Sequence, residues 1–120
     1  MARVLAVDDS VSLRRLVATT LAAAGHEVTE SANGAEALDH AKKKTFNLVI
    51  SDLNMPIMDG LTFIKHMRAL GAYKFTPILV LTTEMDPEKK KAAKDAGATG
   101  WIVKPFDPEQ LLTTIRKVLG

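Results

Sequence analysis

The stretch FNLVISDLNMPIMDG, residues 46–60, predicts a buried strand that ends on a carboxylate. Residues 48–50, Leu-Val-Ile, are apolar and rich in β-branched side chains, which is typical of a strand buried on both faces. The run stops at Asp52, after which Pro56 and Gly60 favour a turn. In open α/β sheets, ligands bind at the edge where such strands end. Alone, Asp52 fits either a ligand-binding acid or an acid that only caps its own loop.

Three other apolar runs also end in polar groups. The runs at residues 4–7, 78–81 and 101–103 are followed by Asp8-Asp9, Thr82-Thr83 and Lys104-Pro105. Parallel strands end at one edge of a sheet, so these groups should converge with Asp52. Three acids in one crevice repel one another unless a cation lies among them, and an all-oxygen set favours Mg²⁺. With a hydroxyl and an ammonium added, the set predicts a phosphoryl group bound beside a metal ion.

Length and composition predict one globular domain over residues 1–120, with no output domain. Hydrophobic residues make up 47% of the chain and charged residues 25%, as in ordinary globular proteins. The absence of cysteine excludes disulfides and cysteine-ligated metal sites. No apolar run approaches the ~20 residues of a membrane span, and no signal peptide precedes the first acids, so we expect a cytoplasmic protein. A net charge of +2 gives no argument for nucleic-acid binding.

Helical patterns alternate with the strand runs along the chain. Helices are expected after Ser10, after Asn33-Gly34, from Leu61, after Asp86 and after Asp107, the last with Gln110 as a capping-box partner. The second strand, residues 27–30, is polar, as expected at a sheet edge. Five strands alternating with five helices predict a doubly wound, flavodoxin-like parallel sheet. Acids after the first and third strands favour the strand order 2-1-3-4-5.

Two helices have features that bear on the site. In the helix after Ser10, apolar spacing predicts a buried stripe that includes Leu16 and leaves Arg14 and Arg15 on the outer face. The helix after Asp86 has an inner face of alanines (Ala92, Ala93 and Ala96) and an outer face of lysines (Lys89, Lys90, Lys91 and Lys94). Alanine packing is thin, so we expect this helix to be the least firmly held.

The polar groups that end the strands resemble those of CheY-like, single-domain receivers of two-component signalling. The matching positions are Asp8, Asp9, Asp52, Thr82, Lys104 and Pro105, and the resemblance extends over residues 4–119. It implies that Asp52 takes a phosphoryl group from a histidine kinase, forming an acyl phosphate. It also implies that Lys104 and Thr82 contact that group, and that Lys104-Pro105 is a cis peptide.

The resemblance further implies a metal site and a partner surface. Asp9, helped by Asp8, would hold Mg²⁺ together with Asp52 and the backbone carbonyl of Asn54. The protein would be a monomer. It would not be an enzyme, except that it would catalyse its own phosphorylation and dephosphorylation. It would bind a downstream protein, with the flagellar motor switch as one candidate and with no role for membranes. The partner surface would comprise the helix after Asp86, the strand at 101–103 and the last helix, and its contacts would include Trp101, Lys90 and Lys94.

Chemotaxis-type signalling is favoured because Asn54 and Glu84 match the chemotaxis-type members, whereas Thr83 and Trp101 depart from the commonest residues. A phosphorelay intermediate and a phosphate sink remain alternatives. A Mg²⁺-dependent aspartyl phosphohydrolase is disfavoured because such enzymes use a second acid two residues after the nucleophile, and Asn54 exchanges no proton. A flavin or nucleotide carrier would need a glycine-rich phosphate loop after the first strand. An inactive receiver would lack a member of the acid, hydroxyl and lysine set.

Overall fold

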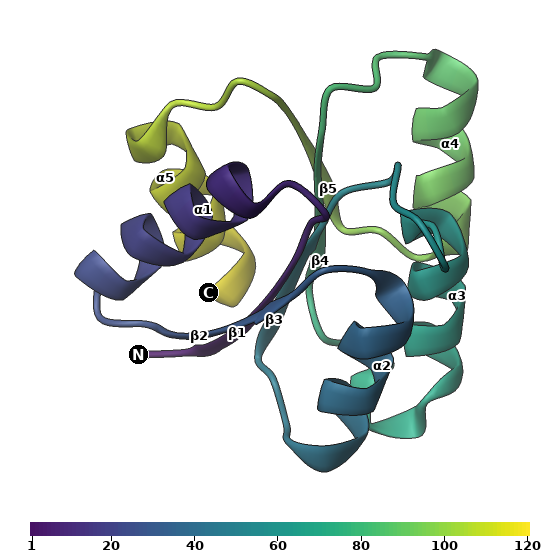
Figure 1. Ribbon diagram of the computed structural model, residues 1–120, viewed down its shortest axis with the longest axis horizontal. Helices are drawn as coiled ribbons and strands as arrows, with labels where there is room; N and C mark the ends of the chain where they lie inside the picture. Colours follow the sequence, from purple (N-terminus) through teal and green to yellow (C-terminus); the bar gives the residue numbers. More distant parts are fainter.

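The computed structural model describes all residues from Met1 to Gly120 and contains five strands that alternate with five α-helices (Figure 1). The elements are β1 (Arg3–Val7), α1 (Val11–Ala23), β2 (Glu27–Ser31), α2 (Gly34–Lys43), β3 (Leu48–Ser51), α3 (Gly60–Ala69), η1 (Gly71–Tyr73), β4 (Ile78–Thr82), α4 (Pro87–Ala96), β5 (Gly100–Val103) and α5 (Pro108–Leu119). The predicted alternation is confirmed. The short 3₁₀-helix η1 is an addition.

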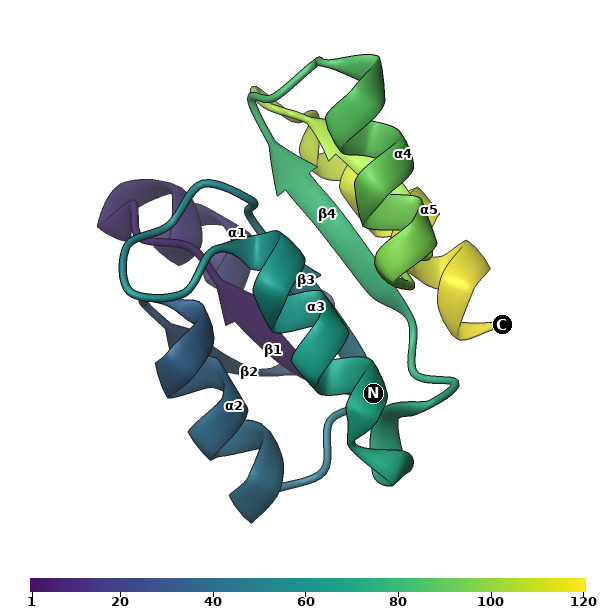
Figure 2. The ribbon, with the colours of Figure 1, turned by 90° about the vertical axis from the view of Figure 1, so that its right-hand side faces the viewer.

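All five strands are parallel and lie in the order β2-β1-β3-β4-β5, as predicted. The strand β1 pairs with β2 on one side and with β3 on the other, so the strands after β2 are added on the opposite side of β1. Figure 2 shows β1 and β4 pointing the same way. Ligand sites in such sheets lie at the carboxyl ends of the strands beside this switch point.

Helices cover both faces of the sheet, with α1 and α5 on one face and α2, α3 and α4 on the other (Figures 1 and 2). Alternate residues of a strand belong to two separate hydrophobic cores, because successive side chains point to opposite faces of the sheet. Leu5 and Val7 belong to the core under α2, α3 and α4, whereas Val4 and Ala6 belong to the core under α1 and α5. Burial on both faces accounts for the continuous apolar runs of the sequence.

The pair Asp59-Gly60 is the start of α3 rather than a free-standing turn. The Asp59 carboxylate accepts a hydrogen bond from the Thr62 N–H and caps the helix. Gly60 follows the cap in a crowded place, since a Cβ built there would lie 2.0 Å from the carbonyl oxygen of Asp52. The close approach of α3 to the end of β3 therefore requires glycine.

Three details of the predicted helices were wrong. Leu16 is 46% exposed, because Val17 and Leu21 carry the buried face of α1. The Gln110 side chain forms no capping box, and Asp107 instead caps α5 by accepting from the Glu109 N–H. The third detail concerns Arg14, which reaches inward from α1 and is described with the site.

The helix α4 is thinly packed, as predicted, with Ala93 as its only buried residue. Its carboxyl end is nevertheless held by Arg68 of α3, whose Nε and Nη2 donate to the Gly97 carbonyl at 3.1 and 2.8 Å. The same guanidinium donates to the carbonyls of Tyr73 and Thr76 before β4. The carboxyl end of α4 is thus anchored to α3 and to the segment before β4.

Candidate functional site

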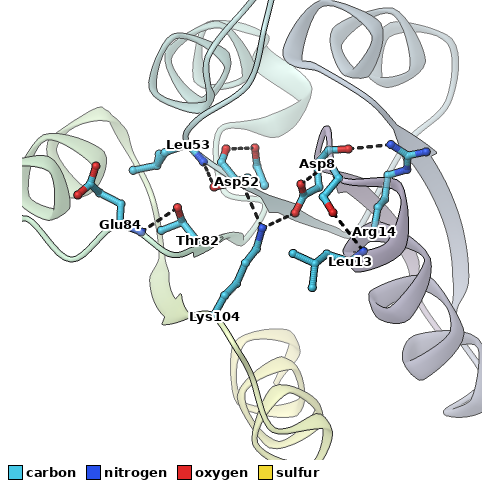
Figure 3. Close-up of polar contacts among 10 residues, drawn as sticks. Asp8, Leu13, Arg14, Asp52, Leu53, Thr82, Glu84 and Lys104 are labelled. Atoms are coloured by element: carbon cyan, nitrogen blue, oxygen red, sulfur yellow. Dashed lines mark hydrogen bonds and ion pairs between the residues drawn. The ribbon is translucent and has the colours of Figure 1, made fainter.

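Four strands deliver polar side chains to one edge of the sheet (Figure 3). Asp8 follows β1, Asp52 follows β3, Thr82 ends β4 and Lys104 follows β5. All four are buried, with exposed fractions of 9% or less. Buried polar groups need partners, so the bonds among them decide what the site does.

Lys104 bridges the two buried acids. Its Nζ donates to Asp8 Oδ2 at 2.6 Å and to Asp52 Oδ2 at 3.1 Å. Burial acts to lower the pKa of Lys104, but the hydrogen bonds and negative charges of Asp8 and Asp52 outweigh it and raise the pKa above its ordinary value. The resting site therefore holds a charged ammonium between two carboxylates. The Lys104-Pro105 peptide is cis, as the resemblance implied.

Asp9 completes a cluster of three carboxylates with Asp8 and Asp52. One oxygen from each lies within 4.8 Å of the others, and Asp9 is exposed to solvent at the mouth of the cluster. Three carboxylates with an open side suit Mg²⁺, which takes a few carboxylate ligands and keeps several waters. These residues therefore fit the predicted cation. Asn54 lies exposed in the loop after β3, and its predicted role as a carbonyl ligand stays a prediction.

Asp52 is held in one orientation by its own loop. Its Oδ1 accepts from the Leu53 N–H at 2.7 Å, and its Oδ2 faces Lys104. The backbone carbonyl of Asp52 accepts from the Ser51 hydroxyl, and the Gly60 N–H donates to the Leu53 carbonyl. The carboxylate thus does more than cap its loop, since it presents an oxygen to the cationic side of the crevice.

Thr82 is fully buried, and its hydroxyl oxygen accepts from the Glu84 N–H at 3.2 Å (Figure 3). The Glu84 carboxylate accepts from the N–H groups of Met85 and Asp86 and pairs with Lys89 at 3.1 Å. The hydrogen bond from Lys89 and those from the backbone hold the pKa of Glu84 below its usual value. Thr82 is therefore connected to the start of α4 through two consecutive contacts.

The residues predicted for a partner surface do lie together. Lys90, Lys94 and Trp101 line a groove of about 450 Å³ between α4 and the start of β5. Trp101 is half-buried and packs against the core under α2, α3 and α4. The groove places positive charge beside an aromatic side chain. Aromatic residues are enriched at protein interfaces, whereas lysine is depleted there, so Trp101 is the stronger indication of a contact surface.

Sequence reasoning missed Arg14. The expectation placed it on the outer face of α1, but its Nη1 donates to the Asp8 backbone carbonyl at 2.7 Å and its Nε to Glu30 at 3.0 Å. A long side chain at the flank of a helix reaches back toward the sheet when acceptors lie there. The only hint in the sequence was Glu30, an acid on an otherwise half-buried edge strand.

Comparison with known proteins assigns the sequence that forms this site to a family. The sequence matches the profile of the response regulator receiver domain over residues 4–116. The chain belongs to the response regulator receiver domain family. This match confirms the resemblance that the strand-ending residues indicated.

Relatives of this receiver domain include chemotaxis proteins. It is 40% identical to a chemotaxis protein CheY homolog of Campylobacter jejuni, over 98% of this chain and 92% of the relative. Identity to the chemotaxis protein CheY1 of Helicobacter pylori is 38%, over 98% and 97% of the two chains. The solved structure of the chemotaxis protein CheY4 of Vibrio cholerae is 58% identical, covers 98% of each chain and has a TM-score of 0.95. These matches support a response regulator of chemotaxis-type signalling. None of the helices has the length and hydropathy of a membrane span.

Proposed function

We propose that this receiver domain accepts a phosphoryl group on Asp52 from a histidine kinase and thereby changes a surface that a downstream protein binds. The observation that carries the proposal is the setting of Asp52. One of its oxygens is fixed by a backbone N–H, the other faces the Lys104 ammonium, and two further carboxylates lie beside it. A carboxylate nucleophile, a cation for the phosphoryl oxygens and a metal site are what phosphoryl transfer needs.

The transfer exchanges one bond for another. An oxygen of Asp52 supplies the electron pair of the new O–P bond, and the pair of the broken N–P bond stays on the histidine ring of the kinase. Lys104 stabilises the charge on the phosphoryl oxygens, and the Thr82 hydroxyl turns from Glu84 to donate to one of them. Because the kinase draws its phosphoryl group from ATP, we assign the reaction to the cytoplasm.

Asp9, Asp8, Asp52 and the Asn54 carbonyl would hold Mg²⁺ in this proposal. When bound, the ion supplies positive charge to the phosphoryl oxygens. The residues present favour it, since three acids share the crevice with a single ammonium. Affinity should be weak because few protein ligands are offered and water completes the shell.

A labelling experiment tests the assignment. The protein is incubated with acetyl phosphate and Mg²⁺, and bound phosphoryl is measured by intact mass and by its lability in base. We expect stoichiometric labelling of the wild type and of Asp39→Asn, a control in which an exposed helical acid is changed, and none of Asp52→Asn. Undiminished labelling of Asp52→Asn would remove Asp52 as the acceptor. Catalytic turnover of a generic phosphomonoester would instead favour the phosphohydrolase.

We propose that the output surface comprises α4, β5 and α5, with contacts from Trp101, Lys90 and Lys94. Support comes from the route that leads from Thr82 through Glu84 to Lys89 on α4, and from the thin packing of that helix. The downstream protein is a motor-switch component in a chemotaxis role. The relay and phosphate-sink alternatives are distinguished by whether the phosphorylated protein binds such a component or passes its phosphoryl group on.

Trp101 is the only tryptophan, so its fluorescence reports on this surface. Beryllofluoride with Mg²⁺, a mimic of the phosphoryl group, should change its emission and its access to quenchers. The change should be lost in Thr82→Ala and kept in Thr83→Ala, whose side chain is exposed next to the switch position. Identical signals with and without the mimic would exclude Trp101 from the coupling and leave Asp52 as the acceptor.

A further inference from the structure

Asp8 is fixed at every one of its polar atoms. Its N–H donates to the Ser31 carbonyl at 3.1 Å, and its Oδ1 accepts from the Ser10 N–H at 2.9 Å. Its Oδ2 accepts from Lys104 at 2.6 Å, and its carbonyl oxygen accepts from Arg14 at 2.7 Å (Figure 3). Three of these partners are backbone groups or belong to the charged site. The fourth, Arg14, is a side chain that the proposed chemistry does not use.

Arg14 is itself held from the opposite side. Its Nε pairs with Glu30 of β2 at 3.0 Å, and its side chain is only 14% exposed. Arg14 also lines a cavity of about 10 Å³ whose walls include Asp8 and Asp52. The guanidinium therefore lies beside Asp8 on the side of the site nearest β2, and it forms no ion pair with the carboxylates of the cluster.

The neighbouring Arg15 provides a natural comparison. It pairs with the other carboxylate oxygen of Glu30 at 3.2 Å, yet its side chain is 68% exposed and forms no hydrogen bond with Asp8. Both arginines carry the same charge and share the same acid. They differ in burial and in the bond to the Asp8 carbonyl.

We infer that Arg14 is a positioning residue for the cation site, which fixes the turn between β1 and α1 so that Asp8 and Asp9 present their carboxylates together. The inference rests on the proposed function, because it concerns the Mg²⁺ site assigned there. Groups that hold the ligands of a metal site in place typically contribute 10- to 100-fold to metal affinity. We expect the lower end of this range, because Arg14 binds a backbone carbonyl rather than a ligand atom.

Charge alone predicts the opposite sign. Removing a positive side chain near a cation site reduces repulsion and strengthens cation binding. If Arg14 acted only through its charge, Arg14→Met would raise the affinity, and Arg15→Met would raise it by less because its charge is more exposed. If Arg14 positions Asp8, Arg14→Met lowers the affinity while Arg15→Met leaves it unchanged or slightly higher.

The test is a titration of the full chain with Mn²⁺, which takes the same oxygen ligands as Mg²⁺ and whose free form is counted by EPR. We expect Arg14→Met to bind Mn²⁺ about tenfold more weakly than the wild type, in line with second-layer groups elsewhere. Arg15→Met is the matched control. Ile115→Val in the core under α5 controls for stability, because it lowers stability without touching the site.

Each outcome distinguishes the inference from the proposed function. Equal or tighter binding by Arg14→Met than by Arg15→Met would overturn the role of Arg14 and leave the metal site intact. No binding by the wild type would overturn the metal site and the inference with it. Weaker binding in Ile115→Val would show that stability governs affinity and would also overturn the inference. Should Arg14→Met not fold in chelator, Arg14→Lys, which keeps the charge with a single donor group, must still show a loss relative to Arg15→Met.

Discussion

Replacing Asp52 by asparagine should stabilise the metal-free protein. Asp52 faces two like charges, with oxygens within 4.8 Å, and one opposite charge, Lys104, at 3.1 Å. With an effective dielectric constant of about 20, the two repulsions amount to at least ~7 kcal/mol and the one attraction to ~5 kcal/mol. The difference favours the neutral side chain by ~2 kcal/mol, and solvent around exposed Asp9 reduces it to about 1 kcal/mol.

The assay is thermal unfolding in chelator at low ionic strength. A gain of about 1 kcal/mol corresponds to a rise in melting temperature of about 4 °C for a domain of this size. The gap should narrow as salt screens the repulsion, and again as Mg²⁺ stabilises the wild type by binding to its folded state. The exposed control Asp39→Asn should change stability by less than about 0.5 kcal/mol.

The reasoning fails if Asp52→Asn melts at or below the wild-type temperature in chelator while Asp39→Asn is unchanged. That result would mean that Lys104 more than neutralises the cluster. The metal would then have to displace the ammonium rather than relieve a repulsion. A gap that does not respond to salt would likewise point away from charge as its cause.

Three further predictions follow from the same structure. Gly60→Ala should lower the free energy of unfolding, measured in urea, by about 3 kcal/mol or more, because the new Cβ would lie 2.0 Å from the Asp52 carbonyl oxygen. The same displacement of the Asp52 backbone should reduce phosphoryl labelling. Ile57→Asn should stabilise it by about 1 kcal/mol, since Ile57 is a β-branched residue at φ 69°, where asparagine is far better tolerated; an unchanged urea midpoint would contradict this. Lys104→Met should lower the free energy of unfolding by about 3 kcal/mol at pH 7. Because the folded-state pKa of Lys104 is raised above 10.5, the wild type loses this extra stability only as the pH rises through the raised value. The difference in urea midpoint between the variant and the wild type should therefore stay constant between pH 7 and 9 and narrow only as the pH rises above 10.5.

The sheet and the site edge were predictable because four of the five strands are apolar runs that end in a characteristic polar group. An apolar run that stops on an acid, a hydroxyl or a lysine marks the carboxyl edge, and parallel topology then brings the markers together. Asp8, Asp52, Thr82 and Lys104 meet for this reason.

Features that depend on approach between distant segments were not predictable. The need for glycine at position 60 arises only when α3 closes against the end of β3, which no local pattern encodes. Arg14 was misplaced because helical spacing describes where a Cβ points, whereas a guanidinium lies several bonds further out. The inward position of Arg14 depends on two acceptors from other segments, the Asp8 carbonyl and the Glu30 carboxylate.

The unequal anchoring of α4 gives that helix the geometry of a lever. Its carboxyl end is tied through the Gly97 carbonyl to Arg68, while its amino end is joined to the site only by the segment that runs from Thr82 past Glu84. A helix of ten residues is about 15 Å long. Any rotation that preserves the Arg68 bonds must therefore displace the amino end most and the region beside Gly97 least. A partner bound near Lys90, between the two ends of α4, would be displaced by only a fraction of the movement at Pro87. The distance of a contact from the fixed point at Arg68 therefore determines how large a displacement the partner undergoes.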